Sequence, residues 1–167
     1  PDLPFYSQAK GLIPDEKWAS KIKRGWYKGD LINTIIGQGS VTCTTLQLAT
    51  MIARIASEKK VMPTMEPKKA SFEPLNLSQE ALATLKAGLW NASNSGGGTS
   101  YSGRIAEAGY EFAGKTGTAQ VVSKYVKLGT AYKVLEEKPH GLFVGFAPFH
   151  EPRFAIATIY QNGGYGA

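Results

Sequence analysis

The four residues Lys115-Thr116-Gly117-Thr118 combine chemical groups that could bind an anionic ligand. Lys115 supplies a positive charge, and the hydroxyls of Thr116 and Thr118 supply hydrogen-bond donors. Gly117 has no side chain, so the backbone of a ligand could lie close against the chain there. The amide of Thr118 could donate to an oxyanion that develops during acyl transfer. Together these groups are suited to binding a peptide's terminal carboxylate.

Placing these side chains in one site requires a particular strand geometry. Residues 110–122 alternate as in a β-strand. Strict alternation puts Lys115 on the opposite face from Thr116 and Thr118. The three side chains can share one ligand only if it meets the strand edge-on, so we expect an edge strand that borders a cleft. For this motif alone, an ordinary strand lysine between threonines is the favoured interpretation.

Residues 109–116 also match the nucleotide-binding P-loop in a formal sense. That loop requires a buried strand before it and a helix after it, which together cradle phosphate. Residues 102–108 are instead small and polar, and residues 117–122 have a strand pattern. None of the three aspartates ends an apolar strand, so a carboxylate for magnesium is missing as well. We therefore disfavour an NTPase.

Two segments have the apolar spacing of amphipathic helices. The first covers residues 44–57, where Thr44 and Gln47 form a capping box. The second covers residues 79–90 and follows the capping residue Ser78. The side chains expected to face a core are Leu48, Met51, Ile52 and Ile55 in the first helix, and Leu82, Leu85 and Leu89 in the second.

The remaining pattern indicates loops and a sheet. Residues 1–30 are mostly loop, with a short helix after Pro14, and residues 91–98 are a flexible glycine-rich loop. Residues 142–147 and 154–160 are short apolar runs joined by a five-residue connection, which predicts a hairpin. Because both runs are apolar on both faces, we expect them in the middle of a covered sheet. Helices followed by consecutive strands favour an α+β fold with an antiparallel sheet.

Composition indicates a folded protein of one domain. The chain has 167 residues, of which 43% are hydrophobic and 19% charged, and it has no apolar run long enough for a membrane span. The net charge of +6 is concentrated in the first thirty residues, where it predicts a solvated basic face or attraction to an anionic surface. No nucleic-acid motif accompanies it. The basic residues there are Lys10, Lys17, Lys21, Lys23, Arg24 and Lys28.

Cysteine and histidine are too few for a disulfide or a metal cluster. Cys43 is the single cysteine, and we expect it to be a small buried residue. His140 and His150 flank an apolar run and are predicted to be strand-end residues. We therefore expect no metal.

Five stretches, in order along the chain, give the sequence a specific resemblance. It resembles the transpeptidase domain of class B penicillin-binding proteins, with the first stretch favouring the elongation type, penicillin-binding protein 2. Thr45 stands where that family usually has proline, and Gly141-Leu142 replaces a more usual Ala-Trp pair. The stretches are Trp26-Tyr27-Lys28-Gly29-Asp30 with Gly37-Gln38-Gly39, residues 44–49, residues 114–120, residues 140–148 and Gln161-Asn162-Gly163-Gly164.

The resemblance implies a β-lactamase/transpeptidase-like fold, an antiparallel sheet covered by helices on both faces. It implies a peptidoglycan D,D-transpeptidase that cross-links stem peptides during cell-wall elongation, is acylated by β-lactams and needs no cofactor. It also implies a place at the periplasmic face of the bacterial inner membrane, with elongation-machinery membrane proteins as partners. The substrate's carboxylate would be bound by Lys115, Thr116, Gly117 and Thr118, of which Lys115 and Thr118 would act in catalysis.

The family's nucleophile is the serine of a Ser-x-x-Lys element, supported by a Ser-x-Asn element that this sequence lacks. Ser-x-x-Lys occurs at Ser7, Ser20 and Ser57, but none of these begins a good helix, so we interpret all three as coincidences. We expect residues 1–167 to be the C-terminal part of the domain, inactive alone and able to bind the missing N-terminal half.

Two other functions share these motifs. A serine β-lactamase has the same fold and a Lys-Thr-Gly element but hydrolyses its acyl-enzyme. A non-catalytic penicillin-recognising sensor module would bind the same ligands without cross-linking. The flanking stretches argue against the β-lactamase, whereas sequence upstream of Pro1 would discriminate the sensor module from the transpeptidase.

Overall fold

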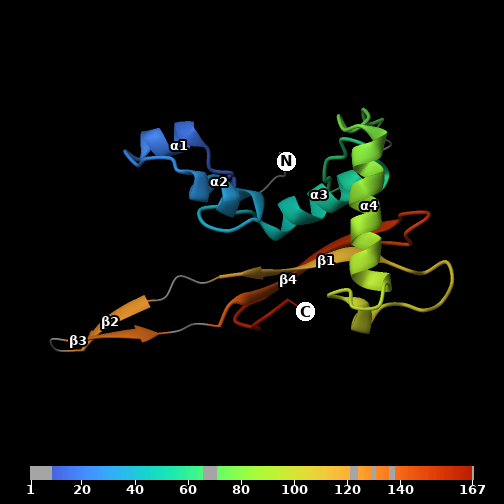
Figure 1. The fold of residues 1–167 in the computed structure, drawn as a ribbon. Coiled ribbons are helices and arrows are strands. Elements are labelled where there is room, and N and C mark those ends of the chain that lie inside the picture. Colours follow the sequence, from blue (N-terminus) through green and yellow to red (C-terminus); the bar gives the residue numbers. More distant parts are fainter. Residues whose placement is uncertain (1–8, 66–70, 121–123, 129–130, 136–137, 167) are drawn as a thin grey trace. The chain divides into compact units, whose positions relative to one another are not determined.

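The computed structural model describes residues 9–65, 71–120, 124–128, 131–135 and 138–166. These residues belong to two compact units. Of the described residues, 9–44 belong to the smaller unit and those from Thr45 onward belong to the larger. Figure 1 shows the elements of both units along the chain.

The smaller unit contains two short helices. Helix α1, Glu16–Lys21, is capped by Asp15, whose carboxylate accepts a hydrogen bond of 2.7 Å from the amide of Trp18. This is the short helix expected after Pro14. Helix α2, Lys28–Ile35, was not predicted, because its first residues were assigned to a loop. Its start depends on a carboxylate contact that the apolar pattern does not reveal.

The single cysteine lies at the end of this unit, and here the sequence prediction was wrong. Cys43 is exposed rather than buried. Partial shielding of the thiol from water nevertheless raises its pKa. The residue type alone does not distinguish a buried cysteine from one at the surface before a helix.

The larger unit is built on a three-stranded antiparallel sheet, ordered β1-β4-β5. The strands are β1, Ala113–Ala119; β4, His140–Ala147; and β5, Phe154–Tyr160. Among the described strands, β1 pairs with β4 alone, so it has one open edge, as the sequence predicted. The α+β class and the antiparallel sheet are confirmed.

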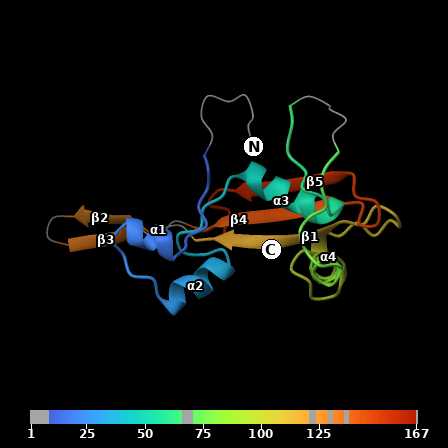
Figure 2. The ribbon, with the colours of Figure 1, turned by 90° about the horizontal axis from the view of Figure 1, so that it is seen from above.

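Helices α3 and α4 pack on one face of this sheet, which carries Ala113, Val144 and Phe146. Helix α3 is Thr45–Ser57 and contacts β4 and β5, whereas α4, Gln79–Asn94, contacts β1 (Figure 2). The fully buried residues between helices and sheet include Ile52 of α3 and Ala113 and Phe146 of the sheet. Burying these apolar side chains against the helices is the main stabilisation of the unit.

Both predicted helices are present, with corrections at their ends and faces. Helix α4 continues through Asn94, so part of the predicted loop is helical. Its cap is confirmed, since the hydroxyl of Ser78 accepts from the amide of Ala81 at 3.1 Å. Met51 and Leu85 are 44% and 43% exposed and do not belong to the core.

The predicted hairpin of β4 and β5 is confirmed, but its surroundings differ from the expectation. β4 lies in the middle of the sheet, whereas β5 is the last strand among the described residues. Its outward side chains are exposed because no described strand or helix covers them. His140 begins β4 as expected, while His150 lies in the connection to β5. The large hydrophobic residues exposed on the outward face of β5 are Phe154, Ile156 and Tyr160.

A second hairpin, β2 (Lys124–Leu128) with β3 (Ala131–Leu135), was not predicted. Its register is related to that of β1 and β4. Ala119 pairs with His140, and Lys124 pairs with Leu135. In both ladders the residue numbers of partners add to the same total, so the two ladders share one register.

No helix in the described part of the chain is long and apolar enough to span a bilayer.

Candidate functional site

The ammonium of Lys115 reaches across the open edge of β1 to its neighbour Thr116. Nζ lies 3.0 Å from the carbonyl oxygen of Thr116 and 3.3 Å from its hydroxyl. Lys115 and Thr116 begin on opposite faces of the strand, yet their polar groups meet at its edge. The alternation of the motif required an edge strand of this kind, and edge-on binding of a ligand stays a prediction.

A third residue, Thr99, completes this cluster and was missed by the sequence analysis. Its hydroxyl oxygen accepts from the hydroxyl of Thr116 at 2.9 Å and from Lys115 Nζ at 3.4 Å. Thr99 lies in the loop between α4 and the short 3₁₀ helix Tyr101–Gly103. The only sequence signal near it is the preceding glycine run, which was interpreted as flexible.

The charge of Lys115 is not balanced by a carboxylate in the described part of the chain. None of the ion pairs found there includes it, and its contacts are to neutral oxygens. The side chain is exposed. An exposed ammonium beside hydroxyl groups at an open strand edge is suited to binding an anion such as a carboxylate.

Thr118 is engaged differently from Thr116. Its hydroxyl accepts from the amide of Gly166 at 3.3 Å, so the segment after β5 lies against this end of β1. The structure therefore brings Lys115 and Thr116 together and leaves the hydroxyl of Thr118 in a separate contact. Between them, a Cβ on Gly117 would meet only the Cβ of Leu142, at an ordinary distance of 3.5 Å.

Two of the three Ser-x-x-Lys serines lie in the described part, and both are bound to their own helices. The hydroxyl of Ser20 donates to the carbonyl of Glu16 at 2.9 Å, and that of Ser57 donates to the carbonyl of Ala53 at 2.7 Å. Ser57 also ends α3, where the helix dipole opposes an anionic nucleophile. Ser7 lies outside the described residues.

The P-loop interpretation also fails on geometry. Lys115 and Thr116 lie inside strand β1, not in a loop at the start of a helix. Their backbone amides belong to a sheet and cannot form a phosphate cradle at a helix N-terminus. The site is therefore an extended strand edge, and this geometry favours an extended peptide-like ligand.

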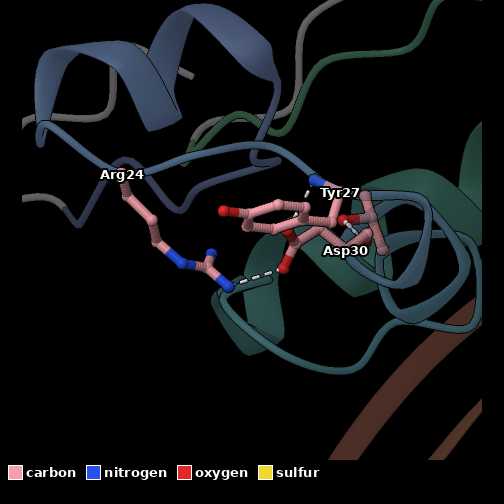
Figure 3. Close-up of polar contacts among 4 residues, drawn as sticks. Arg24, Tyr27 and Asp30 are labelled. Carbon is pink, nitrogen blue, oxygen red and sulfur yellow. Dashed lines mark hydrogen bonds and ion pairs between the residues drawn. The ribbon is translucent and has the colours of Figure 1, made fainter.

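The Trp26–Asp30 stretch makes the polar contacts at the start of α2 in the smaller unit. The carboxylate of Asp30 accepts from the amide of Tyr27 at 3.0 Å and from the guanidinium of Arg24 at 2.7 Å (Figure 3). The Tyr27 amide, followed by Arg24, holds the pKa of Asp30 below its usual range. A Cβ on Gly25 would lie only 2.7 Å from the Tyr27 hydroxyl, so the ring packs over a glycine. These contacts fix the start of α2.

Comparison of the sequence with known families gives one match over nearly the whole chain. A profile of the penicillin binding protein transpeptidase domain matches residues 4–167. The peptidoglycan D,D-transpeptidase MrdA of Acinetobacter baumannii is 36% identical over 99% of this chain. MrdA of Escherichia coli K12 is 31% identical over 95% of it. The chain spans 26% and 28% of these two relatives, about a quarter of their length.

Solved structures agree with this match. PBP2 from Helicobacter pylori, in its complex with MreC, superposes with a TM-score of 0.79 at 28% identity, covering 96% of this chain and 29% of that one. Pseudomonas aeruginosa PBP2 in complex with WCK 5153 gives a TM-score of 0.76 at 30% identity, covering 98% of this chain and 36% of that one. The arrangement of strands and helices described above is therefore that of a transpeptidase domain.

Proposed function

Since this chain belongs to the penicillin-binding protein transpeptidase family and is of the PBP2 type, we propose that it forms the carboxylate-binding wall of a peptidoglycan D,D-transpeptidase. The observation that carries this proposal is the ammonium of Lys115, which no carboxylate among the described residues balances and which lies beside Thr116 at the open edge of β1. A stem peptide laid along this edge would place its terminal carboxylate at these groups.

The reaction is an acyl transfer in two steps. A serine attacks the carbonyl of the penultimate D-alanine, and the terminal D-alanine leaves with the proton of that serine. An amine of a neighbouring stem peptide then attacks the acyl-enzyme, which releases the serine and forms the cross-link. Lys115 and Thr116 hold the carboxylate in the first step, and the amide of Thr118 stabilises the oxyanion. The carboxylate of a penicillin occupies the same place.

The nucleophilic serine, in this proposal, is supplied by a part of the domain outside this chain. Support comes from Ser20 and Ser57, whose hydroxyls are bound to their own helices. The chain alone is then expected to bind carboxylates weakly and to catalyse nothing.

Partners and location follow from the relatives. A PBP2 is known in complex with MreC, and we propose that the protein containing this chain joins an elongation assembly of the same kind. Cross-linking of peptidoglycan places it at the periplasmic face of the bacterial inner membrane.

A fluorescent penicillin tests the proposal directly. We expect the full-length protein to be labelled covalently and residues 1–167 alone to remain unlabelled. Lys115→Ala in the full-length protein should slow labelling by about tenfold or more, because a charged hydrogen bond contributes roughly 1.5–3 kcal/mol. Lys17→Ala, an exposed lysine of α1, is the matched control and should have no effect.

The lifetime of the adduct separates the transpeptidase from its alternatives. An adduct that persists for hours is expected, whereas rapid release of penicilloate would indicate a β-lactamase. Labelling of the isolated chain, or unchanged labelling of Lys115→Ala, would contradict the proposed role of the β1 edge.

A further inference from the structure

We propose that Thr99 is a positioning residue, which holds Lys115 and Thr116 in the arrangement that receives a carboxylate. Its hydroxyl oxygen is the shared acceptor for the Thr116 hydroxyl, at 2.9 Å, and for Lys115 Nζ, at 3.4 Å. One oxygen thus joins the charged group and the neutral donor of the motif. This inference rests on the proposed function of the β1 edge.

The backbone of the loop 95–100 is shaped to bring Thr99 to this place. Gly97 has a φ of +87°, which is the left-handed region that favours glycine. Gly98 passes so close to the end of α4 that a Cβ there would lie 2.6 Å from the carbonyl oxygen of Asn91. Its amide closes a turn onto the carbonyl of Ser95 at 2.9 Å. The glycine run therefore forms a defined turn, at which the chain reverses direction.

The hydroxyls of Ser93 and Ser100 connect the loop to the strand. Ser93 is fully buried, and its hydroxyl lies 3.1 Å from that of Ser100, the residue that follows Thr99. The Ser100 hydroxyl donates to the carbonyl of Ala92 at 3.0 Å, and Ser93 donates to the carbonyl of Gly114 at 3.4 Å. Gly114 directly precedes Lys115. The position of Thr99 relative to the motif is thus set from both sides.

The chemical benefit of this contact is preorganisation. A lysine side chain loses much rotamer freedom when it is held in one conformation, and that loss weakens ligand binding if it occurs at the moment of binding. Because Thr99 engages Lys115 and Thr116 before a ligand arrives, part of this ordering is already present. Removing its hydroxyl should weaken recognition of the carboxylate while leaving the fold intact.

Two substitutions of opposite character test the proposal in the full-length protein. Thr99→Val keeps the shape and removes the hydroxyl, whereas Thr99→Ser keeps the hydroxyl and removes a methyl group. We expect acylation by benzylpenicillin to be about tenfold slower in Thr99→Val and within twofold of the wild type in Thr99→Ser. A packing role would produce the reverse order and would overturn the inference.

The dependence on the ligand's carboxylate supplies a second measurement. The ratio of acylation rates for benzylpenicillin and its methyl ester should fall in Thr99→Val, as in Lys115→Ala, and should stay unchanged in Thr99→Ser. Thr84→Val is the control, because Thr84 is an exposed residue of α4 whose hydroxyl donates only to its own helix, to Glu80. Melting temperatures identify any variant that is misfolded, and Thr99→Ala then replaces Thr99→Val.

The outcomes distinguish this inference from the proposed function. If the wild type reacts, Lys115→Ala is slow and Thr99→Val behaves as the wild type, the role of Thr99 is refuted and the function stands. If the wild type does not react, or Lys115→Ala reacts normally, the proposed function fails and the inference fails with it.

Discussion

Gly114 and Gly117 lie three residues apart in β1, and each is glycine for a different reason. A Cβ on Gly114 would overlap the ring of Phe143 and lie 2.6 Å from the carbonyl oxygen of Val144, so the fold itself excludes a side chain. A Cβ on Gly117 would meet only Leu142, at an ordinary contact distance. The described fold thus tolerates a side chain at Gly117, and its absence there fits the close approach of a ligand.

This contrast gives a paired prediction. Gly117→Ala should leave the melting temperature nearly unchanged but slow acylation of the full-length protein by a penicillin, by about tenfold, because a methyl group stands between the strand and the ligand. Gly114→Ala should lower the melting temperature through overpacking, by the equivalent of about 1–3 kcal/mol. The measurements are thermal melting and the rate of acylation. A Gly117→Ala protein with a lowered melting temperature and a normal acylation rate would contradict the assignment of Gly117 to ligand binding.

The sequence identified Lys115 and Thr116 as a pair because charge, hydroxyl and strand pattern coincide within a few residues. It missed Thr99, whose partners are 16 and 17 positions away. Cys43 was placed in a core for its residue type and is exposed. Short-range chemistry can thus be predicted from the sequence, whereas contacts across a chain reversal depend on the conformation of glycines such as Gly97 and Gly98.

At the scale of elements, helix α2 depends on one carboxylate. Asp30 accepts from the amide of Tyr27 at the helix start and from Arg24 (Figure 3). Both contacts lower the pKa of Asp30, so the folded unit binds a proton there less readily than the unfolded chain does. The stabilisation that ionised Asp30 gives to the folded unit is complete above the ordinary aspartate pKa, about 3.9. It is lost as the pH falls through the lower pKa that Asp30 has in the folded state.

We therefore predict that α2 loses protection at acid pH before α4 does. Amide hydrogen exchange of residues 28–35 should accelerate below about pH 4, relative to the intrinsic rate, and Asp30→Asn should show the faster exchange already at neutral pH. Asp15→Asn, which keeps a capping side chain on α1, is the control. Equal protection of wild-type and Asp30→Asn amides would contradict this role.

The elements with strong patterns were predicted and those with weak ones were not. Helix α3 and strands β4 and β5 have long apolar runs or clear periodicity, and their positions were correct within a few residues. Helix α2 was missed because its first residues include Gly29 and were assigned to a loop, although Leu31 and Ile35 have the spacing of one helix face. The β2–β3 hairpin was missed because lysines interrupt its aromatic and β-branched residues.

At the scale of the molecule, both units expose large apolar side chains. The surface of the smaller unit includes α2 residues that are half or more exposed, and the larger unit exposes the outer side of β5. Soluble monomers rarely present such patches. The residues are Leu31, Ile32 and Ile35 in α2, and Phe154, Ile156 and Tyr160 in β5.

We predict that residues 1–167 alone self-associate or bind the rest of a transpeptidase domain. Sedimentation velocity should show oligomers of the isolated chain at micromolar concentration, and co-expression with the preceding part of the protein should give a soluble complex. Replacing Ile156 and Tyr160 by threonine should reduce self-association without removing β5. A monomeric chain with one sharp melting transition would contradict this prediction, because the apolar surfaces of α2 and β5 would then be stable in contact with water.

The register shared by the two hairpins also has a kinetic consequence. Strands β2 and β3 are close in sequence and can pair locally, and pairing of β1 with β4 then closes only a short additional loop. Once β2 and β3 have paired, β4 is already close to β1, the strand that carries Lys115, and the two strands can pair next. The entropy cost of bringing β1 and β4 together is thereby reduced. Deleting the hairpin should therefore slow formation of the sheet far more than it lowers the stability of the folded sheet.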